Sequence, residues 1–363
     1  MTNKLISLFD YENKAKALLS EDVWQFISGG ALDESTVSRN RSSMNQYLLQ
    51  PKRFKDVGSV DVSTKVLGST IQLPVMISPA GSQSLAHSQG EEATASATCR
   101  ASTVMVVGTA ASRNLETVRK VSNGLLWFQL YHHGSALTEM LIRRAETAGY
   151  QALCVTVDVP HTITAEKDLR NNWKLPYGTE MANFTCDEAG LGMKPNTPEA
   201  RQYRRPPHIP VTWDTVDWIR SITKLPIVIK GIMRADDAVG CIEREVQGII
   251  VSNHGGRQLD GQASTIEVLP EIVKAAGQKC EIFVDGGFRR GIDVLKAVAL
   301  GAKAVLIARP VFHALSVAGD VGVEHVLNIL RSELYEAMAL CGVRNLAEVD
   351  ENLIYSYPSI GSS

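Results

Sequence analysis

Apolar, β-branched runs alternate with longer amphipathic stretches along most of the chain from about residue 70. A short, nearly continuous apolar run is typical of a strand that is buried on both faces of a sheet. Eight such runs lie at residues 73–79, 102–108, 125–131, 152–158, 226–231, 248–253, 282–287 and 304–310. Helical patterns fall between them, for example at residues 136–149 and 291–302. Ser264 and Glu267 form a capping-box signature, which predicts that a helix begins there.

Eight strands that alternate with helices predict an α/β fold, a closed (β/α)8 barrel of the TIM type. An open, doubly wound sheet is the alternative. That architecture carries a GxGxxG turn after its first strand, whereas the first run here is followed by "SPAGSQS". The pattern therefore favours the closed barrel.

Two segments fall outside this alternation, and we expect a single domain over residues 1–363. The pattern in residues 1–70 predicts an N-terminal helical segment with a short hairpin, and we expect this segment to pack against a barrel that spans residues 71–345. Residues 159–212 form a long insertion after the fourth strand, rich in polar residues and prolines. A connection of that length usually has a function or is disordered, and its place at the active-site end of the strands predicts a lid.

Composition and charge exclude several classes of function. A chain of 363 residues, 44% of them hydrophobic, can bury a large core, and a net charge of −2 favours neither nucleic acid nor an anionic membrane as a partner. No apolar run approaches the length that spans a bilayer, and the first residues lack the core of a signal peptide. The six cysteines have no CxxC spacing, so we expect free thiols, no metal site and a cytoplasmic protein.

Polar and small residues collect at the carboxyl ends of the predicted strands, where barrels of this kind carry their chemistry. The stretch "VSNHGGRQLDG" at residues 251–261 contributes Ser252, His254 and Arg257. The other strand ends contribute Pro79, Ala80, Gly81, Gly108, Gln129, Tyr131, Thr156, Asp158, Lys230, Asp285, Gly286, Gly287, Arg289, Ala308 and Arg309. Each side chain alone also fits a structural role. Together around one mouth they predict an active site.

The motifs "DGGFRRG" and "ARP" predict a site for a phosphate monoester. They place glycines and the guanidinium groups of Arg289 and Arg309 at the seventh and eighth strands, where many barrels bind phosphate. The alternative is a tight turn with two solvated arginines.

At these motifs the chain resembles the FMN-dependent 2-hydroxy-acid oxidases, the family of glycolate oxidase, lactate oxidase and the flavin domain of yeast-type lactate dehydrogenase. The resemblance runs from "FDYENKAKALL" to "EVDENLI". It implies FMN as the cofactor, a small-molecule 2-hydroxy substrate and a homotetramer. Because nothing in the sequence indicates a heme domain or a membrane segment, we expect oxygen as the electron acceptor.

The resemblance also implies which residues hold FMN. Pro79, Ala80 and Gly81 would back the ring system, and Lys230 would place positive charge beside it and stabilise the reduced, anionic flavin. The remaining implied contacts are Gly108, Gln129, Thr156 and Ser252 to the ring, Asp285 to the ribityl chain, and Gly286, Gly287, Arg289, Ala308 and Arg309 around the phosphate.

For the reaction itself, the resemblance implies that His254 is the base. His254 would take the hydroxyl proton as a hydride passes to flavin N5; the alternative is that it takes the α-proton. Asp158 would orient His254 and stabilise its imidazolium. Arg257 would bind the substrate carboxylate, and Tyr131 would hydrogen-bond the substrate oxygen.

Three positions on the substrate side depart from the family pattern. Phe26 stands where the family has a tyrosine, Ala110 where glycolate oxidase has a tryptophan, and Ala165 where the family has a second arginine. Each lost charged hydrogen bond weakens carboxylate binding by about 1.5–3 kcal/mol. We therefore expect a substrate larger or less charged than glycolate or lactate: a bulky 2-hydroxy acid, a 2-hydroxy or 2-amino amide or ester, or a modified peptide end in natural-product biosynthesis.

Three alternatives stay open. The first is an ordinary L-lactate or glycolate oxidase in which His161 or another residue of the insertion replaces the arginine. The second is a decarboxylating, lactate monooxygenase-like enzyme, because Gly81 lacks a methyl group that the oxidases carry and so would leave room beside the flavin. The third is a non-catalytic FMN-binding barrel.

Overall fold

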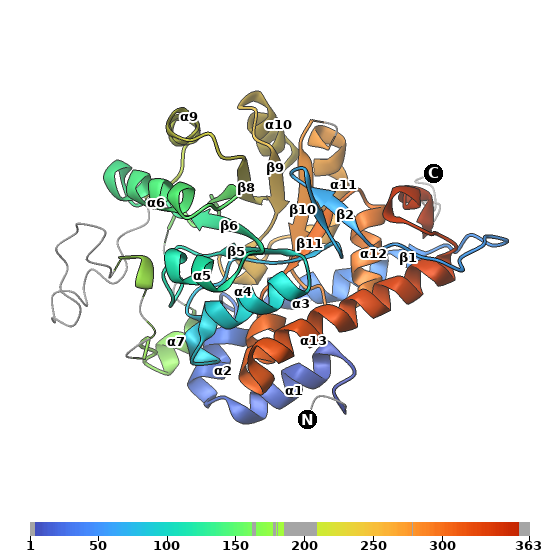
Figure 1. Cartoon of the computed structure of the whole chain (residues 1–363), viewed down its shortest axis with the longest axis horizontal. Coiled ribbons are helices and arrows are strands. Elements are labelled where there is room, and N and C mark those ends of the chain that lie inside the picture. The colour runs from blue at the N-terminus through green and yellow to red at the C-terminus, as the bar shows by residue number, and fades with distance from the viewer. Residues whose placement is uncertain are drawn as a thin grey trace.

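The computed structural model describes residues 4–161, 165–176, 179, 181–184, 209–277 and 279–355. Eight parallel strands close into a barrel in the order β10-β11-β4-β5-β6-β7-β8-β9 (Figure 1). They are β4 (Val75–Ile77), β5 (Val104–Val107), β6 (Leu125–Leu130), β7 (Ala152–Thr156), β8 (Ile227–Ile232), β9 (Gly248–Val251), β10 (Glu281–Asp285) and β11 (Ala304–Ile307). Each lies within or next to one of the predicted runs, so the predicted closed barrel is confirmed.

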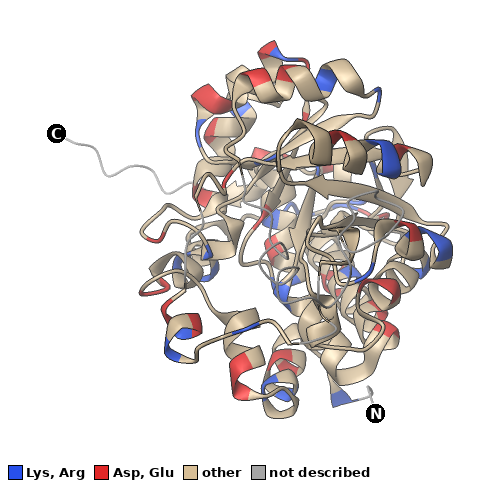
Figure 2. Ribbon diagram, turned by 90° about the vertical axis from the view of Figure 1, so that its left-hand side faces the viewer, with Lys and Arg blue, Asp and Glu red and all other residues tan. Residues whose placement is uncertain are grey.

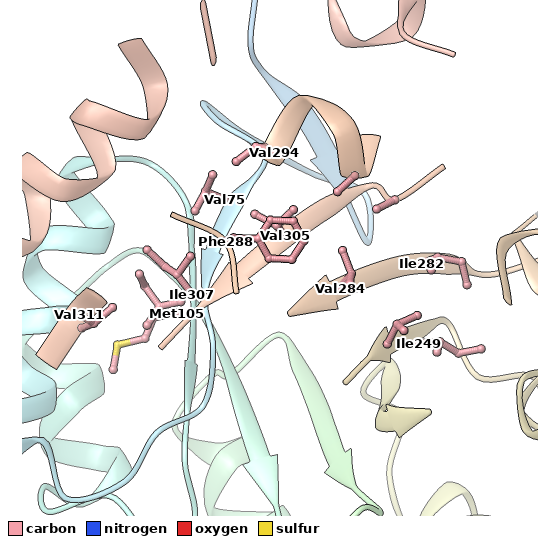
Figure 3. Packing of buried hydrophobic residues seen from close by; sticks show 14 of the residues in the cluster. Val75, Met105, Ile249, Ile282, Val284, Phe288, Val294, Val305, Ile307 and Val311 are labelled. Carbon is pink, nitrogen blue, oxygen red and sulfur yellow. The ribbon is translucent and has the colours of Figure 1, made fainter. Parts of the chain in front are cut away.

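Alternate strand residues face two separate cores. In β11, Leu306 points into the barrel, whereas Val305 and Ile307 point out toward the helices. Figure 3 shows the outer core, where these two residues meet Val294 and Val311 of the surrounding helices. Residues buried on both faces explain why the strands read as continuous apolar runs instead of alternating ones.

Side chains fill the barrel interior. Trp127 and Phe283 pack edge to face there, with ring centroids 5.6 Å apart. The hairpin of β2 (Thr64–Val66) and β3 (Ser69–Ile71) adds Val66 and Ile71 to the same cluster. This hairpin closes the amino-terminal end of the barrel, so only the carboxyl ends of the strands are left to form a site.

Helices surround the barrel. They are α4 (Gly90–Arg100), α5 (Leu115–Val121), α6 (Ser135–Thr147), α9 (Trp213–Ile222), α10 (Ala235–Glu243), α11 (Thr265–Ala276), α12 (Gly291–Ala299) and α13 (Arg309–Cys341). The predicted capping box is present at the start of α11, where the Glu267 carboxylate accepts hydrogen bonds from the Ser264 N–H and hydroxyl, both at 2.8 Å. The long α13 is kinked at Ala318 and Gly319.

The N-terminal helices cover part of the barrel mouth. They are α1 (Leu8–Leu18), α2 (Glu21–Ser28) and α3 (Ser35–Ser42), and α1 lies along α13 (Figure 1). The Tyr11 hydroxyl and His325 Nδ1 are 2.8 Å apart between these two helices. Farther along, α3 packs so closely on the loop after β10 that a methyl group at Gly287 would lie 2.1 Å from the Asn40 carbonyl oxygen. The glycine is therefore required by contact with α3.

The segment after β7 is only partly described. It contains the short helix α7 (Glu166–Arg170) and a single turn at Ala182–Phe184. Residues 162–164, 177, 178, 180 and 185–208 of the predicted lid lie outside the described residues, so the lid stays a prediction. Charged side chains of both signs are mixed over the outer helices (Figure 2). Among the described residues, no helix is long and apolar enough to cross a membrane.

From the packing of the barrel interior we predict that a buried and an exposed phenylalanine differ in how much their removal lowers stability. Phe283→Ala removes a fully buried ring, and we expect it to lower the free energy of unfolding by about 3–5 kcal/mol. Phe54 is fully exposed, so Phe54→Ala should change stability by less than about 0.5 kcal/mol. Denaturant unfolding measures both; equal effects would contradict the described core.

Candidate active site

A cavity of about 800 Å³ opens at the carboxyl ends of the strands. Most of the predicted site residues line it: Phe26, Pro79, Ala80, Gly81, Ala110, Gln129, Tyr131, Ala165, Lys230, His254, Arg257, Asp285, Gly286, Gly287, Arg289, Ala308 and Arg309. Barrel closure brings these residues together from strands and loops that are far apart in the sequence.

His254 and Asp158 form a hydrogen-bonded pair at the cavity edge. His254 Nδ1 and Asp158 Oδ1 are 2.8 Å apart, and the His254 N–H donates to Ser252 Oγ at 3.1 Å. His254 adopts a left-handed φ of 55°, which is strained for a non-glycine residue. Gly231 permits the pair, since a methyl group there would lie 2.6 Å from Asp158 Cβ. With Nδ1 held by Asp158, Nε2 is the ring nitrogen left to face the cavity.

The Asp158 carboxyl is ionised. Burial alone would raise the pKa of Asp158. The charges of His254 and Lys230 lower that pKa by more than burial raises it, so the net pKa lies below its usual range. An ionised Asp158 can stabilise the imidazolium that a histidine base becomes once it takes a proton.

Lys230 is the buried cation of the cavity floor. Its Nζ donates to Ser252 Oγ at 2.8 Å and lies 3.3 Å from Asp285 Oδ2. Burial lowers its pKa, but Asp285 and Asp158 raise it more, and the net pKa lies above its usual range. Lys230 therefore stays protonated at every physiological pH.

The two oxygens of Asp285 differ in their contacts. Oδ2 faces Lys230 and accepts a hydrogen bond from Ser78 Oγ at 3.2 Å, whereas the buried Oδ1 has no hydrogen-bond partner among the described residues. A buried carboxylate oxygen of this kind calls for a hydroxyl or N–H donor from a ligand.

Two half-buried arginines, Arg289 and Arg309, line another part of the cavity. Burial, together with the nearby charges of Arg257 and Arg289, lowers the pKa of Arg309 to about 9. Burial also lowers the pKa of Arg289. Neither arginine forms an ion pair with a carboxylate within the described part of the chain. His313 lies behind them, stacked on Trp24, and burial together with the two arginines lowers its pKa to about 3, so it is neutral. The cluster therefore gathers positive charge on one side of the cavity.

The end of α2 closes one side of the cavity. Arg257 Nη1 donates to the carbonyl oxygens of Phe26 at 2.8 Å and Gly29 at 2.9 Å, and Arg309 Nη2 donates to the same Gly29 oxygen at 2.8 Å. The Phe26 ring stacks on Trp173, with centroids 4.9 Å apart. An aromatic, apolar wall therefore stands on this side of the cavity.

Some predicted residues do not line the cavity. Gly108, Thr156 and Ser252 are buried behind it, and Thr156 Oγ1 accepts a hydrogen bond from Gln129 Nε2 at 3.0 Å. Their contact with FMN stays a prediction. His161 is exposed and is not among the lining residues, so the expectation that it replaces the missing arginine is not supported.

Gly81 packs closely against the loop after β5. A methyl group built at Gly81 would lie 2.4 Å from the Ala110 carbonyl oxygen, so a larger residue at this position would displace the Ala110 backbone. The room beside the flavin on which the monooxygenase-like alternative rests stays a prediction.

Sequence reasoning missed several residues of the cavity wall. Trp173 belongs to the insertion, and Ile27, Met181, Phe288 and Phe312 also line the cavity. Trp173 is an aromatic residue in the otherwise polar stretch "NNWKLP", and this contrast is the feature of the sequence that could have identified it as a cavity residue. The other four look like ordinary core residues in the sequence.

Comparisons with known proteins agree with this geometry. A family model described as FMN-dependent dehydrogenase matches residues 15–356. L-lactate oxidase of Nostoc sp. is 44% identical over 359 residues, 96% of this chain and 98% of that protein. 2-Hydroxyacid oxidase 1 of Homo sapiens is 39% identical over 364 residues, 99% of this chain and 98% of that protein. A crystal structure of an arginine-to-leucine variant of mandelate oxidase with 2-hydroxy-phenylacetamide has a TM-score of 0.89 and 36% identity, over 99% of this chain and 100% of that one.

The residues present fit FMN. The unpartnered Asp285 Oδ1 suits a ribityl hydroxyl, and Arg289 with Arg309 suits a phosphate dianion. Protonated Lys230 would supply positive charge to the ring.

From the His254–Asp158 pair we predict how removal of the Asp158 charge affects the reaction rate. Asp158→Asn should lower kcat by about 10²- to 10⁴-fold, because the neutral amide neither fixes the imidazole nor stabilises its protonated form. The low pKa of Asp158 keeps it ionised at and above about pH 5, so the variant should be slower than the wild type throughout the range from about pH 5 to about pH 9. A pH–rate profile of both proteins measures this.

A matched control is Asp260→Asn. Asp260 lies in the same loop region but accepts the N–H groups of Ser35 and Thr36 at the start of α3. Its amide variant should keep its activity. An equal loss in both variants would show that the effect comes from the fold.

Proposed function

Because the chain belongs to the FMN-dependent dehydrogenase family and is an oxidoreductase of the 2-hydroxy-acid oxidase type, we propose that it oxidises a 2-hydroxy or 2-amino substrate that is larger or less charged than glycolate or lactate. A 2-hydroxy substrate gives the 2-oxo compound directly. A 2-amino substrate gives the 2-imino compound, which water then hydrolyses to the 2-oxo compound and ammonia; oxygen is the electron acceptor in both cases. The observation that carries the proposal is the substrate side of the cavity, where Phe26, Ala110 and Ala165 replace polar or bulky family residues.

His254 acts as the base in this proposal. Its Nε2 takes the hydroxyl proton, and the ionised Asp158 at Nδ1 stabilises the resulting imidazolium. Removal of the α-proton by the same nitrogen is the alternative. FMN, when bound, accepts the two electrons that leave the substrate. Tyr131, on the same cavity wall, orients the substrate oxygen.

In this proposal Arg257 is the one residue that binds the substrate carboxylate. Its guanidinium lies 5.2 Å from the centre of the Phe26 ring, and Ala165 offers neither charge nor a hydrogen bond. The stacked pair of Phe26 and Trp173 suits a planar or apolar group. The arginine-to-leucine mandelate oxidase solved with an uncharged amide supports the view that this fold accepts such ligands when an arginine is absent.

An ordinary L-lactate oxidase is the second candidate. The 44% identity to the Nostoc enzyme favours it. The non-catalytic barrel gains no support, because a binding protein has no need of the His254–Asp158 pair.

Anaerobic flavin reduction separates these candidates. The panel is glycolate, L-lactate, L-mandelate, bulkier 2-hydroxy acids and the matching amides and 2-amino amides, mixed with FMN-loaded protein in a stopped-flow instrument. We expect rapid bleaching by bulky or neutral members only. Faster bleaching by L-lactate than by any of these would establish the lactate oxidase instead.

Restoring the lost arginine provides a gain-of-function test. Ala165→Arg adds a charged hydrogen bond to a carboxylate, so the ratio of kcat/KM for mandelate over mandelamide should rise about 10- to 100-fold. Ala165→Leu is the control, because it fills similar space without charge and should leave that ratio within about threefold. If both variants shift the ratio alike, position 165 does not act through charge.

A further inference from the structure

A fully buried carboxylate, Glu91, lies behind the cavity wall. It belongs to the first turn of α4, where the helix dipole favours negative charge. It is absent from the cavity lining and forms no ion pair among the described residues. A buried carboxylate without a cation is costly unless its oxygens are met by donors.

The donors to Glu91 come from two different loops. Oε1 accepts the N–H of Gln83, after β4, at 3.1 Å and the N–H of Ser112, after β5, at 3.0 Å. Oε2 accepts the Ser112 hydroxyl at 2.7 Å. The same hydroxyl accepts the N–H of Ser84 at 3.0 Å. Burial raises the Glu91 pKa, and these hydrogen bonds oppose that rise. One side chain thus ties both loops together.

The two loops meet where they form the cavity wall. The Ser82 N–H donates to the Ala110 carbonyl at 3.1 Å, and the same oxygen occupies the space of a Gly81 methyl group. Ala80, Gly81, Ser82 and Ala110 all line the cavity. The gap between the loops therefore sets one dimension of the site.

We propose that Glu91 is a positioning residue that holds these two loops together and thereby determines how large a group the cavity admits beside the reacting carbon. This inference rests on the proposed function, since it concerns the size selectivity of the same site. Glu91 acts only through Gln83 and Ser112 and does not touch the substrate.

Glu91→Leu tests the proposal by removing both acceptors while keeping an apolar side chain. Glu91→Gln is the conservative variant, because its amide oxygen still accepts the two N–H groups. Glu281→Leu is the matched control: Glu281 is a partly buried glutamate at the other end of the barrel, and its Oε2 accepts the Leu67 N–H at 2.9 Å. Ser112→Ala keeps Glu91 and serves if Glu91→Leu fails to fold.

Two readouts are measured on the FMN-loaded proteins. The first is the dissociation constant of pyruvate and of benzoylformate, a small and a bulky 2-oxo acid, followed through the flavin absorbance. The second is amide hydrogen exchange of peptides that cover residues 80–86 and 108–114. Thermal unfolding gives the stability of each variant.

In Glu91→Leu we expect the dissociation constant of benzoylformate, divided by that of pyruvate, to give a ratio about tenfold lower than in the wild type, because the wider cavity favours the bulky acid. A change of about tenfold is the effect that one methylene group has in a hydrophobic pocket. Exchange should rise in both loops together. Glu91→Gln should restore the ratio to within about twofold, and Ser112→Ala should shift it in the same direction as Glu91→Leu. Glu281→Leu should lower stability without changing the ratio.

An unchanged ratio in Glu91→Leu, or an equal change in Glu281→Leu, would overturn the inference. So would faster exchange in one loop only. A wild-type protein that binds neither acid would contradict the proposed function alone, and hydrogen exchange would still decide whether Glu91 holds both loops.

Discussion

Closure of eight parallel strands into one ring is the constraint on which the rest of this structure depends. It buries every strand on both faces and leaves side chains only two directions, into the filled interior or out toward the helices. The β2–β3 hairpin occupies the amino-terminal end. The carboxyl ends are therefore the place where polar side chains from distant parts of the chain meet, and His254, Lys230 and Asp285 meet there.

The charges at that mouth follow a common logic. Lys230 is paired with Asp285, and His254 with Asp158, so each of these two carboxylates has a basic side chain as its partner. Arg289 and Arg309 are half-buried, and within the described ranges neither forms an ion pair with a carboxylate. An arginine pair of this kind suits an anionic ligand group. The carbonyl oxygen of Gly29, at the end of α2, accepts hydrogen bonds from both Arg257 and Arg309 and so links the two side chains.

The cavity combines the His254–Asp158 pair, which is the base of the proposed function, with an apolar wall. Phe26 and Trp173 stack in that wall, and the Ala110 backbone fills the space next to Gly81. The form of the wall depends on apolar contacts and on the positions of the loops, whereas the His254–Asp158 pair depends on charge. Residues of the wall can therefore change without altering the pair, and one barrel fold can accept substrates of different size.

Sequence alone determined the barrel, because the apolar runs, their number and the helices between them admit few other folds. It also determined which strand ends carry polar groups, and 17 predicted residues line the cavity. Tertiary structure decided the rest. It placed Gly108, Thr156 and Ser252 behind the wall, left His161 outside, filled the space at Gly81 and brought Trp173 and the buried Glu91 to the site. The reason is physical: periodicity records which face of an element is buried, whereas the approach of two loops depends on contacts between residues that the sequence keeps far apart.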